Sequence, residues 1–390
     1  MKIIDSIRNK IQIYFRNYML SKLVYKPIYN LNHDLTHKQK KIALVYITTP
    51  FNKQIFDNNI YHVNILHQIQ IVKQLINYNF SIDIYPTNKF DLTTNVNYDY
   101  ILGFGENYKK ICKQNPKAKK ILLVTENLPL IVSENYTERL NYYSKRHPGK
   151  KIYAIPRNNY YDMEMFTNSD YGIIMNGTYN YNKMKKYFKR NSYRINVNSL
   201  QNPYFNIDNN KEFENIQKNF LWFGSNGFIH KGLDILIDAF KFLPEYTLNI
   251  YGIDKKELKQ TELTKNIILH ERINVNSSNF IKEVVNNNTF VLSLSCSEGM
   301  MSSIATCMMH GLIPITTKET GFDDVPFMLF FDSFNVNEVI NTIKNTQNLS
   351  IEELHQLSTQ SIKYANIEYS IDRFDKDFNN IMHKILFEKE

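Results

Sequence analysis

Short apolar runs alternate with longer amphipathic stretches through most of this sequence, and no other feature limits the fold as strongly. Residues 42–47 have the length and composition of a buried strand, and a helical pattern follows at residues 62–77. Four further apolar runs come before residue 180: 82–85, 100–103, 121–124 and 171–175. Parallel strands need helical crossovers, so this order predicts successive β-α-β units and a parallel sheet covered by helices.

The same alternation resumes in the second half of the chain after a polar break. The second set of predicted strands is 220–223, 248–251, 267–269, 290–294 and 313–315. We therefore predict an α/β chain of two facing Rossmann-like domains with parallel sheets and an inter-domain cleft: residues 41–205 and 219–370, joined by the linker 206–218. A length of 390 residues also favours two domains over one. The C-terminal helix, residues 371–390, can cross back to the first domain.

Charge and cysteine content limit the partners and the compartment. The formal charge of +9 indicates an anionic partner, such as nucleic acid, a membrane surface or a phosphorylated ligand, without choosing among them. Cys112, Cys296 and Cys307 are too few and too scattered for a disulfide framework or a zinc site. No apolar run is long enough to span a bilayer, and charged residues interrupt any secretory signal. We therefore expect a cytoplasmic protein.

Residues 1–40 form a basic amphipathic segment before the first predicted strand. Ile4, Ile11 and Phe15 recur at helical spacing, while basic residues outnumber the acidic Asp5. Such a segment suits the anionic inner face of a membrane, where the protein would then be peripheral. An ordinary helix docked on the first domain explains the same pattern, because lysine and arginine stems also cover apolar surface. The sequence leaves both interpretations open.

A glycine-rich turn follows the first predicted strand of the second domain and leads into a helix. The glycines let the backbone approach a ligand closely, the first helical amides can bind a phosphate, and Lys231 adds a positive charge. A glycine turn before a helix is also common as a simple connection between a strand and a helix, so this motif alone is weak evidence for a phosphate site. The candidate donor-binding residues here are Gly224, Ser225, Asn226, Gly227 and His230.

A second strand-to-helix junction of the same domain carries a carboxylate, Glu298. This side chain can accept hydrogen bonds from vicinal hydroxyls, while the backbone amides after it meet a sugar or a phosphate. The further candidate donor-binding residues are Ser297, Gly299, Met300, Met301, Ser302 and Thr306. An isolated Glu-Gly pair is most often a solvated loop, but the carboxyl ends of parallel strands share one edge of a sheet. We therefore expect Lys231 and Glu298 to meet beside one bound nucleotide sugar.

The second domain resembles the retaining GT-B glycosyltransferases of family 4, also called the glycosyltransferase group 1 family. The likeness lies in residues 223–234, 248–252 and 297–315. In the first domain only the strand-helix rhythm matches, together with His62 and Asn64 before a helix, which is similar to the pattern of bacterial surface-polysaccharide members. The GT-B fold places two Rossmann-like domains face to face, as the alternation predicts.

This resemblance implies transfer of a sugar from a nucleotide sugar to a glycan or lipid-linked glycan, with retention of anomeric configuration. The implied setting is the assembly of a surface polysaccharide: lipopolysaccharide, capsule or exopolysaccharide. No cofactor and no obligatory metal is implied, because the nucleotide sugar is itself a substrate. Lys231 would neutralise the leaving diphosphate, and Glu298 would bind the ribose or the sugar of the donor; both are candidate catalytic residues.

The chain departs from the family pattern at two positions. Thr306 stands where a glutamate is usual, eight positions after Glu298, and Ser225 stands where an arginine is usual. Each substitution removes a charge-assisted contact worth about 1.5–3 kcal/mol. The hydroxyl of Thr306 can still bind a donor, and Arg272, just after a predicted strand, can supply the missing cation.

Acceptor-side candidates lie in the first domain. His62 is a third candidate catalytic residue, because a neutral imidazole at the start of a helix can take a proton or bind a phosphate across the cleft. Asn64, Glu126 and Arg157 are the candidate acceptor-binding residues. Arg157 ends a run of basic residues that begins at Arg139, and we expect this run to form a loop that suits an anionic acceptor.

Three other functions are compatible with an α/β chain of this charge. A dinucleotide-dependent oxidoreductase is disfavoured, because no Gly-x-Gly-x-x-Gly follows the first strand at residues 48–53. A nucleic-acid-binding protein needs one continuous basic surface, whereas the basic residues gather near the N-terminus and in one loop, so nucleic acid is not the expected partner. A nucleotide-sugar-binding protein with weak or no catalysis fits the two departures of Ser225 and Thr306.

Overall fold

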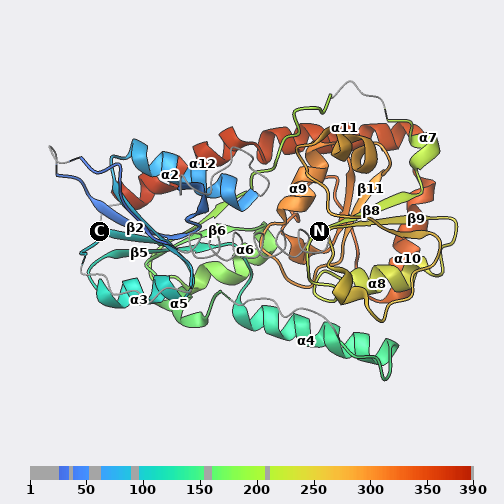
Figure 1. The fold of residues 1–390 in the computed structure, drawn as a ribbon, viewed down its shortest axis with the longest axis horizontal. Helices are drawn as coiled ribbons and strands as arrows, with labels where there is room; N and C mark the ends of the chain where they lie inside the picture. Colours follow the sequence, from blue (N-terminus) through green and yellow to red (C-terminus); the bar gives the residue numbers. More distant parts are fainter. Residues whose placement is uncertain are drawn as a thin grey trace, which may run out of the picture.

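The structure is a computed structural model that describes residues 26–34, 38–51, 63–88, 96–152, 160–206 and 211–387. Three predictions lie outside these residues: the amphipathic pattern of residues 2–25, His62 and Arg157. The described chain forms two α/β domains that lie side by side (Figure 1).

Among the described residues, the first domain is built on a seven-stranded sheet in the order β1-β3-β2-β4-β5-β6-β7. Its strands are β1 (Ile28–Leu31), β2 (Lys41–Tyr46), β3 (Ser81–Pro86), β4 (Tyr100–Gly103), β5 (Lys119–Val124), β6 (Tyr171–Met175) and β7 (Ser192–Ile195). Strand β1 pairs with β3 antiparallel, and every other pairing is parallel. Strands β3, β4 and β6 are buried along their whole length, which explains their continuous apolar runs.

Helices cover both faces of this sheet, with α2 and α12 on one side and α3 and α5 on the other (Figure 1). The helices of the first domain are η1 (Thr49–Phe51), α2 (Val63–Asn77), α3 (Glu106–Gln114), α4 (Pro129–Arg146), α5 (Met163–Asn168), α6 (Thr178–Met184) and η2 (Lys185–Tyr187). Helix α4 differs from the others because it extends under the second domain.

The second domain has a six-stranded parallel sheet, within the described residues, in the order β10-β9-β8-β11-β12-β13. Its strands are β8 (Asn219–Phe223), β9 (Thr247–Tyr251), β10 (Ile267–Leu269), β11 (Phe290–Ser293), β12 (Ile313–Thr316) and β13 (Leu329–Phe330). Its helices are α7 (Phe213–Ile216), α8 (Leu233–Phe240), η3 (Lys255–Leu258), the π-helix η4 (Phe280–Val285), α9 (Ser302–Met309), η5 (Lys318–Thr320), α10 (Val336–Asn345), η6 (Thr346–Asn348) and α11 (Ile351–Glu368). Aromatic rings pack against the sheet, and Phe220 stacks on Phe290 with ring centroids 4.9 Å apart.

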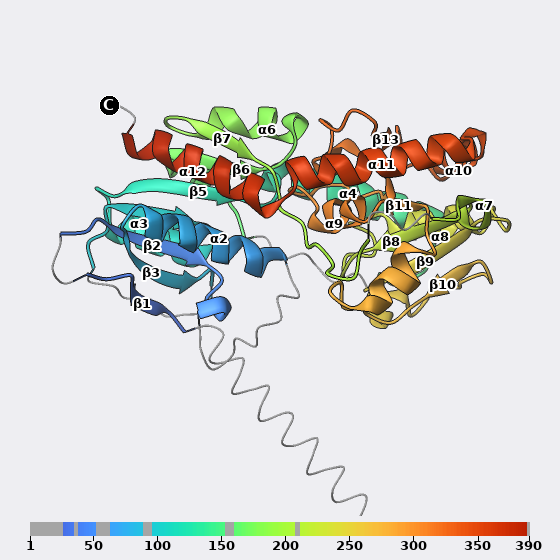
Figure 2. The ribbon, with the colours of Figure 1, turned by 90° about the horizontal axis from the view of Figure 1, so that it is seen from above.

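The last two helices join the domains along one side of the molecule (Figure 2). Helix α11 lies on the second domain, and α12 (Ile371–Phe387) packs on α2 of the first. The Tyr78 hydroxyl donates to the carbonyl of Asn379 at 2.9 Å, and Phe374 stacks on His67 at 5.2 Å. The C-terminal helix therefore returns to the domain in which the chain began.

The α/β fold of two parallel-sheet domains is confirmed, and three local expectations need correction. Strand β1 adds an antiparallel edge to the first sheet. Part of the predicted polar linker is helix α7, because Phe213 is only 1% exposed and packs in the second domain. The basic run after Arg139 is not simply a loop, since it begins inside helix α4, which ends at Arg146.

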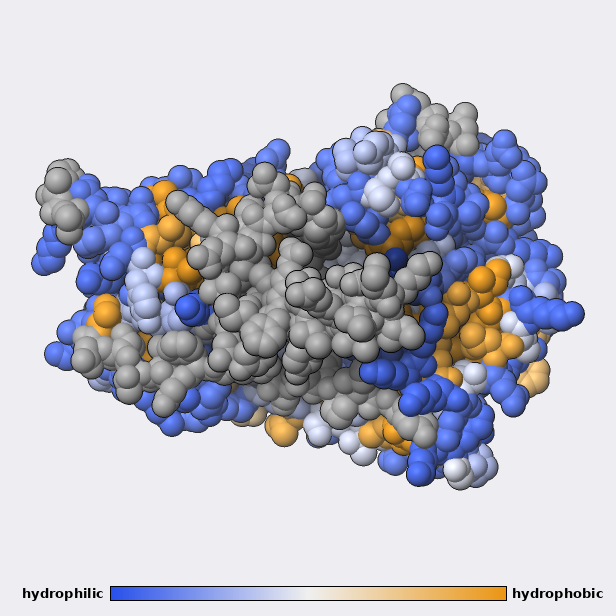
Figure 3. Space-filling view, viewed as in Figure 1, coloured by the Kyte–Doolittle hydropathy of each residue, from blue (hydrophilic) through white to orange (hydrophobic). Residues whose placement is uncertain are grey.

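The visible described surface is mainly hydrophilic, with separate apolar areas, the largest of them on the second-domain side (Figure 3). Among the described residues, none of the helices combines the length and the apolar character needed to cross a bilayer.

Candidate functional site

The glycine turn of the second domain packs tightly against its neighbouring loop. The amide of Gly224 donates to the carbonyl of Tyr251 at 3.2 Å. A methyl group on Gly252 would lie 1.9 Å from the Gly224 oxygen, so the glycine is required for this close approach. Ser225 is exposed and Asn226 is partly buried, so the tip of the turn reaches the surface.

A buried carboxylate, Glu257, occupies the inner amides of this turn. Its oxygens accept from the amide of Gly227 at 3.1 and 3.2 Å and from the amide of Phe228 at 2.9 Å. Glu257 is only 3% exposed. In this structure the protein itself supplies the anion at the Gly227 amide, and the role of Gly227 in donor binding stays a prediction. Sequence reasoning missed Glu257, which lies thirty residues farther along the chain.

His230 joins the glycine turn to the Glu298 loop. Its Nε2 lies 2.6 Å from the carbonyl oxygen of Ser297 and 3.6 Å from Oε1 of Glu298. A carbonyl only accepts, so Nε2 carries the proton and donates, which leaves Nδ1 to face the Cys296 thiol at 3.5 Å. Lys231 is the next residue and is partly buried. The two junctions predicted to share one rim thus meet through His230.

The carboxylate of Glu298 is held from its own loop and is almost completely buried. Oε1 accepts from the hydroxyl of Ser295 at 3.0 Å, and the residue is 6% exposed. The backbone of Glu298 is fixed as well, because its amide donates to the carbonyl of Glu319 at 3.2 Å and its carbonyl accepts from the Asn176 side chain at 3.1 Å. Asn176 follows β6, so both domains position this acid.

Carbonyl groups from both domains accept hydrogen bonds from two amides that we expected to bind a sugar or phosphate. The amide of Met300 donates to the carbonyl of Met175 at 3.0 Å, and that of Met301 donates to the carbonyl of Thr320 at 3.2 Å. These two amides are therefore hydrogen-bonded within the protein in this structure, and their role in donor binding stays a prediction. Met301 caps α9, and Ser302 is partly buried in the first turn of that helix.

Gly299 makes a tight contact between the two domains. A methyl group on it would lie 2.1 Å from the carbonyl oxygen of Thr125 and 3.2 Å from the amide of Glu126, both at the end of β5. We expect Gly299→Ala to lower the free energy of unfolding by about 1–3 kcal/mol, because backbone crowding of this kind cannot be relieved by a rotamer. Chemical denaturation would measure the change. An unchanged unfolding midpoint would show that the domains are not in contact here.

Thr306 and Arg272 lie away from the centre of the site. The Thr306 hydroxyl accepts from the amide of Leu200 at 3.4 Å and is buried inside α9, so it is not directed to the Glu298 carboxylate through any described contact. Arg272 is exposed after the edge strand β10, and Glu298 follows β11, three strands along the sheet. At about 4.8 Å per strand, this separation makes Arg272 a poor replacement for the missing family arginine.

Helix α4 covers the same strand ends from the first domain. The side chain of Asn135 donates to the carbonyl of Cys296 at 2.7 Å, and the Tyr136 ring lies 5.9 Å from His230. Arg139 donates from Nη2 to the carbonyl of Leu294 at 2.9 Å, and burial lowers the pKa of its guanidinium. Sequence reasoning placed Arg139 in an acceptor loop. Pro129, which suits the first position of a helix, was the local signal for the start of α4.

The acceptor-side candidates are only partly described. Glu126 is partly buried directly after β5, with its backbone against Gly299, so it does lie at the site. Asn64 is exposed in the first turn of α2. His62 and Arg157 lie outside the described residues.

The carboxyl ends of both sheets therefore face each other, and the described contacts between them are buried. One carboxylate and one imidazole N–H meet there, and Lys231 follows His230 in the chain. Such groups can bind hydroxyls and an anionic diphosphate. His230, Ser297 and Glu298 are each less than 7% exposed, so little of their surface is open to a ligand in this structure.

No protein-family model matches this sequence, and no curated protein does either. Solved GT-B glycosyltransferases share the fold. Sucrose-phosphate synthase from Thermosynechococcus elongatus matches with a TM-score of 0.62 at 10% identity, over 90% of this chain and 100% of that one. HepE from Anabaena, solved with UDP-glucose, matches with a TM-score of 0.58 at 11% identity, over 88% and 99%.

A longer structure is matched only in part. This chain spans 60% of the GtfA/B complex chain, with a TM-score of 0.51 at 15% identity over 83% of its own length. Because all these sequence identities are low, the similarity establishes the GT-B fold alone.

Proposed function

We propose that this protein is a retaining glycosyltransferase of the family 4 type, which transfers a sugar from a nucleotide sugar to a glycan or lipid-linked glycan. The observation that carries the proposal is the meeting of the His230-Lys231 segment with Glu298 at the facing strand ends of a GT-B fold. The fold is shared with HepE, which was solved with UDP-glucose, and this supports a nucleotide-sugar donor.

The proposed roles follow from charge and position. Lys231 neutralises the diphosphate that leaves as the glycosidic bond to the donor breaks, and Glu298 binds hydroxyls of the donor sugar or ribose. His230 donates to a backbone carbonyl in this structure, and its N–H becomes available to the donor when the two loops separate. The reaction proposed here uses no cofactor and no obligatory metal.

The acceptor enters from the first domain, where Glu126 lies beside Gly299. The proposed acceptor is part of a surface polysaccharide such as lipopolysaccharide, capsule or exopolysaccharide, assembled in the cytoplasm or at the inner face of the membrane. WaaG, a glycosyltransferase involved in lipopolysaccharide biosynthesis, has the same fold with a TM-score of 0.54 at 12% identity, which supports this setting.

A second candidate is a nucleotide-sugar-binding protein with weak or no catalysis. Two observations favour it: Glu257 already occupies the Gly227 and Phe228 amides, and Thr306 is turned toward Leu200. A donor would then bind with fewer protein amides and without a second carboxylate.

Thermal unfolding with UDP, GDP, ADP and an oligonucleotide tests the shared premise of both candidates. We expect one nucleoside diphosphate to stabilise the protein by about 2.7 kcal/mol at a hundred times its dissociation constant, and the oligonucleotide to leave it unchanged. Hydrolysis of the matching nucleotide sugar then separates the enzyme from the binding protein. Stabilisation by the oligonucleotide alone would contradict both.

A further inference from the structure

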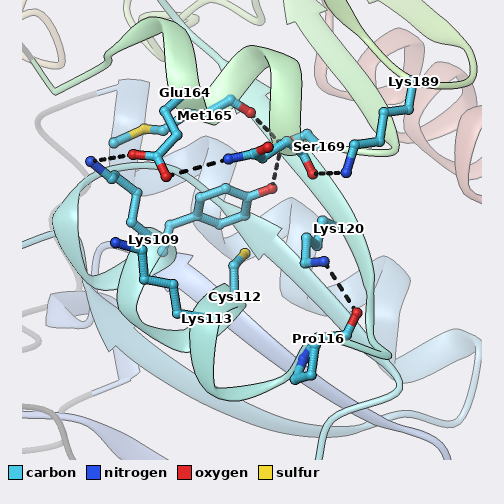
Figure 4. A pocket seen from close by; sticks show the side chains of 11 residues that line it. Lys109, Cys112, Lys113, Pro116, Lys120, Glu164, Met165, Ser169 and Lys189 are labelled. Carbon is cyan, nitrogen blue, oxygen red and sulfur yellow. Dashed lines mark hydrogen bonds and ion pairs between the residues drawn. The ribbon is translucent and has the colours of Figure 1, made fainter.

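A cavity of about 200 Å³ lies in the first domain between α3 and α5 (Figure 4). Pro116 on its wall comes just before β5, and Ser169 comes just before β6. The cavity therefore opens at the amino ends of the parallel strands, which is the edge of the sheet opposite to Thr125 and Gly299. It is separate from the proposed donor site and independent of the proposed function.

Four lysines line this cavity and come from three separate segments of the chain. Lys109 and Lys113 lie on α3, Lys120 is on β5, and Lys189 follows η2. In Figure 4, Lys109 and Lys113 are on one side of Cys112, while Lys120 and Lys189 are on the other. A single acid, Glu164, is among the lining residues, so the lining carries a net positive charge.

The four ammonium groups differ in how far they are neutralised. Lys109 is paired with Asp162 at 2.7 Å and with Glu164 at 3.1 Å. Lys120 instead donates to the carbonyl of Pro116 at 3.3 Å, and Lys189 donates to the carbonyl of Asn168 at 3.1 Å. An ammonium has three donors and a full charge, and a carbonyl neither uses all the donors nor cancels the charge. Lys120 and Lys189 therefore keep the capacity to bind an anion.

The floor between the lysines is neutral and largely apolar. The Tyr108 hydroxyl and the Ser169 hydroxyl lie 2.7 Å apart, and Ser169 donates onward to the carbonyl of Met165 at 2.6 Å, so these polar groups are satisfied. Burial raises the pKa of the Cys112 thiol to about 12, so the thiol is uncharged at neutral pH. Met165 adds a flexible apolar side chain. The floor suits the apolar part of a ligand.

We propose that this cavity binds a small phosphate monoester with an apolar substituent, with the phosphate between Lys120 and Lys189 and the substituent against Met165 and Cys112. Lysine binds phosphate as a point charge and needs no fixed fork geometry, so lysines from separate segments can share one phosphate group. The apolar floor distinguishes this ligand from inorganic phosphate, which has no group to bury.

Phenyl phosphate titrated into the full chain tests this proposal by calorimetry. We expect saturable binding, weaker binding of inorganic phosphate and no binding of phenol. The double variant Lys120→Met, Lys189→Met is expected to weaken phenyl phosphate binding by about a hundredfold, since two charge-assisted contacts are lost and each is worth about tenfold. The matched control is Lys117→Met, Lys186→Met, which removes the same charge from exposed positions beside the same segments but outside the lining.

A spectroscopic signal from Met165 gives a second measurement that does not depend on affinity alone. The NMR signal of a labelled Met165 methyl group should shift when phenyl phosphate is bound, because this side chain lines the cavity. Equal weakening in the two double variants, or no saturable binding to the unaltered chain, would overturn the proposal. Binding of the nucleoside diphosphate identified by thermal unfolding should be the same in all three proteins, so failure here would leave the proposed function untouched.

Discussion

Lys231→Met or Glu298→Gln is expected to lower kcat for sugar transfer by about 10²- to 10³-fold in each variant, the range seen when one preorganised electrostatic group is removed. Methionine keeps the length and apolar stem of Lys231 and removes the charge opposite the leaving diphosphate. Glutamine keeps the acceptor oxygen that the Ser295 hydroxyl uses in Glu298 and removes the negative charge. Initial rates with the nucleotide sugar identified by thermal unfolding would measure both effects.

The control for this prediction is Lys256→Met. Lys256 is exposed in η3 next to Glu257, and its removal changes the net charge as Lys231→Met does. We expect its kcat to stay within a factor of about two, because surface charges are screened by water and salt. Full turnover in both Lys231→Met and Glu298→Gln, in proteins that still bind the donor, would refute the proposed site.

The second large effect concerns the contact between α4 and α8. Arg146, at the end of α4, pairs with both Asp234 and Asp238 on α8, and His147 Nε2 lies 2.7 Å from Asp238. Arg146 is 14% exposed and Asp234 is 2% exposed, measured on their side chains. We expect Arg146→Met to destabilise the protein by about 3–5 kcal/mol, because it leaves a buried carboxylate without its cation. Urea unfolding would measure the loss.

A second arginine of the same kind provides the comparison. Arg194 pairs with Asp324, and both side chains are 34% exposed. Arg194→Met should cost about 1 kcal/mol or less, since an exposed pair gains little in water. If the two arginine variants lost the same stability, burial of the α4–α8 contact would not be what makes Arg146 important.

The loss of stability expected for Arg146→Met also depends on pH. Burial raises the pKa of Asp234 to about 6 in the folded protein, and Arg146 opposes this rise. A folded pKa above the unfolded value of 3.8 means that the native state holds the proton more strongly. The stability contributed by protonated Asp234 is fully present below the pKa of the unfolded chain. It is lost as the pH rises through the pKa of the folded protein. Without Arg146 the pKa of Asp234 rises further.

Arg146→Met should therefore lower the free energy of unfolding by less at about pH 5 than at about pH 8. His147 acts in the same direction, because Arg146 is one of the charges that lower its pKa, and its protonated form would then pair with Asp238 more readily. A deficit that grows as the pH falls would contradict this account of the contact.

Several parts of the site could be predicted because they depend on local sequence. The runs at residues 290–293 and 220–223 are continuous and apolar, so they identify buried parallel strands, and the residues after them must lie at one edge of the sheet. Glu298 and His230 were found in this way, and the structure brings them to 3.6 Å. Arg272 also follows a strand, but strand order in the sheet, which the sequence does not state, puts it at the far edge.

Helix α4 shows why other parts could not be predicted. Its face toward the second domain mixes the apolar contacts of Tyr136, Leu140 and Tyr143 with polar contacts of Asn135, Arg139 and Arg146, so the apolar stripe of an amphipathic helix is interrupted. The basic residues resemble a solvated loop until their carboxylate and carbonyl partners are known. Those partners lie between 88 and 161 residues away along the chain.

The sequence by itself determined the two α/β domains and the strand ends that carry Lys231 and Glu298, because burial on both faces of a parallel sheet requires apolar runs that can be recognised one segment at a time. Only the tertiary structure decided that Glu257 fills the glycine turn, that Gly299 lies against Thr125 and that α4 covers the site. These are contacts between distant segments, and their energy depends on distance and burial in the folded chain, which no local pattern of residues records.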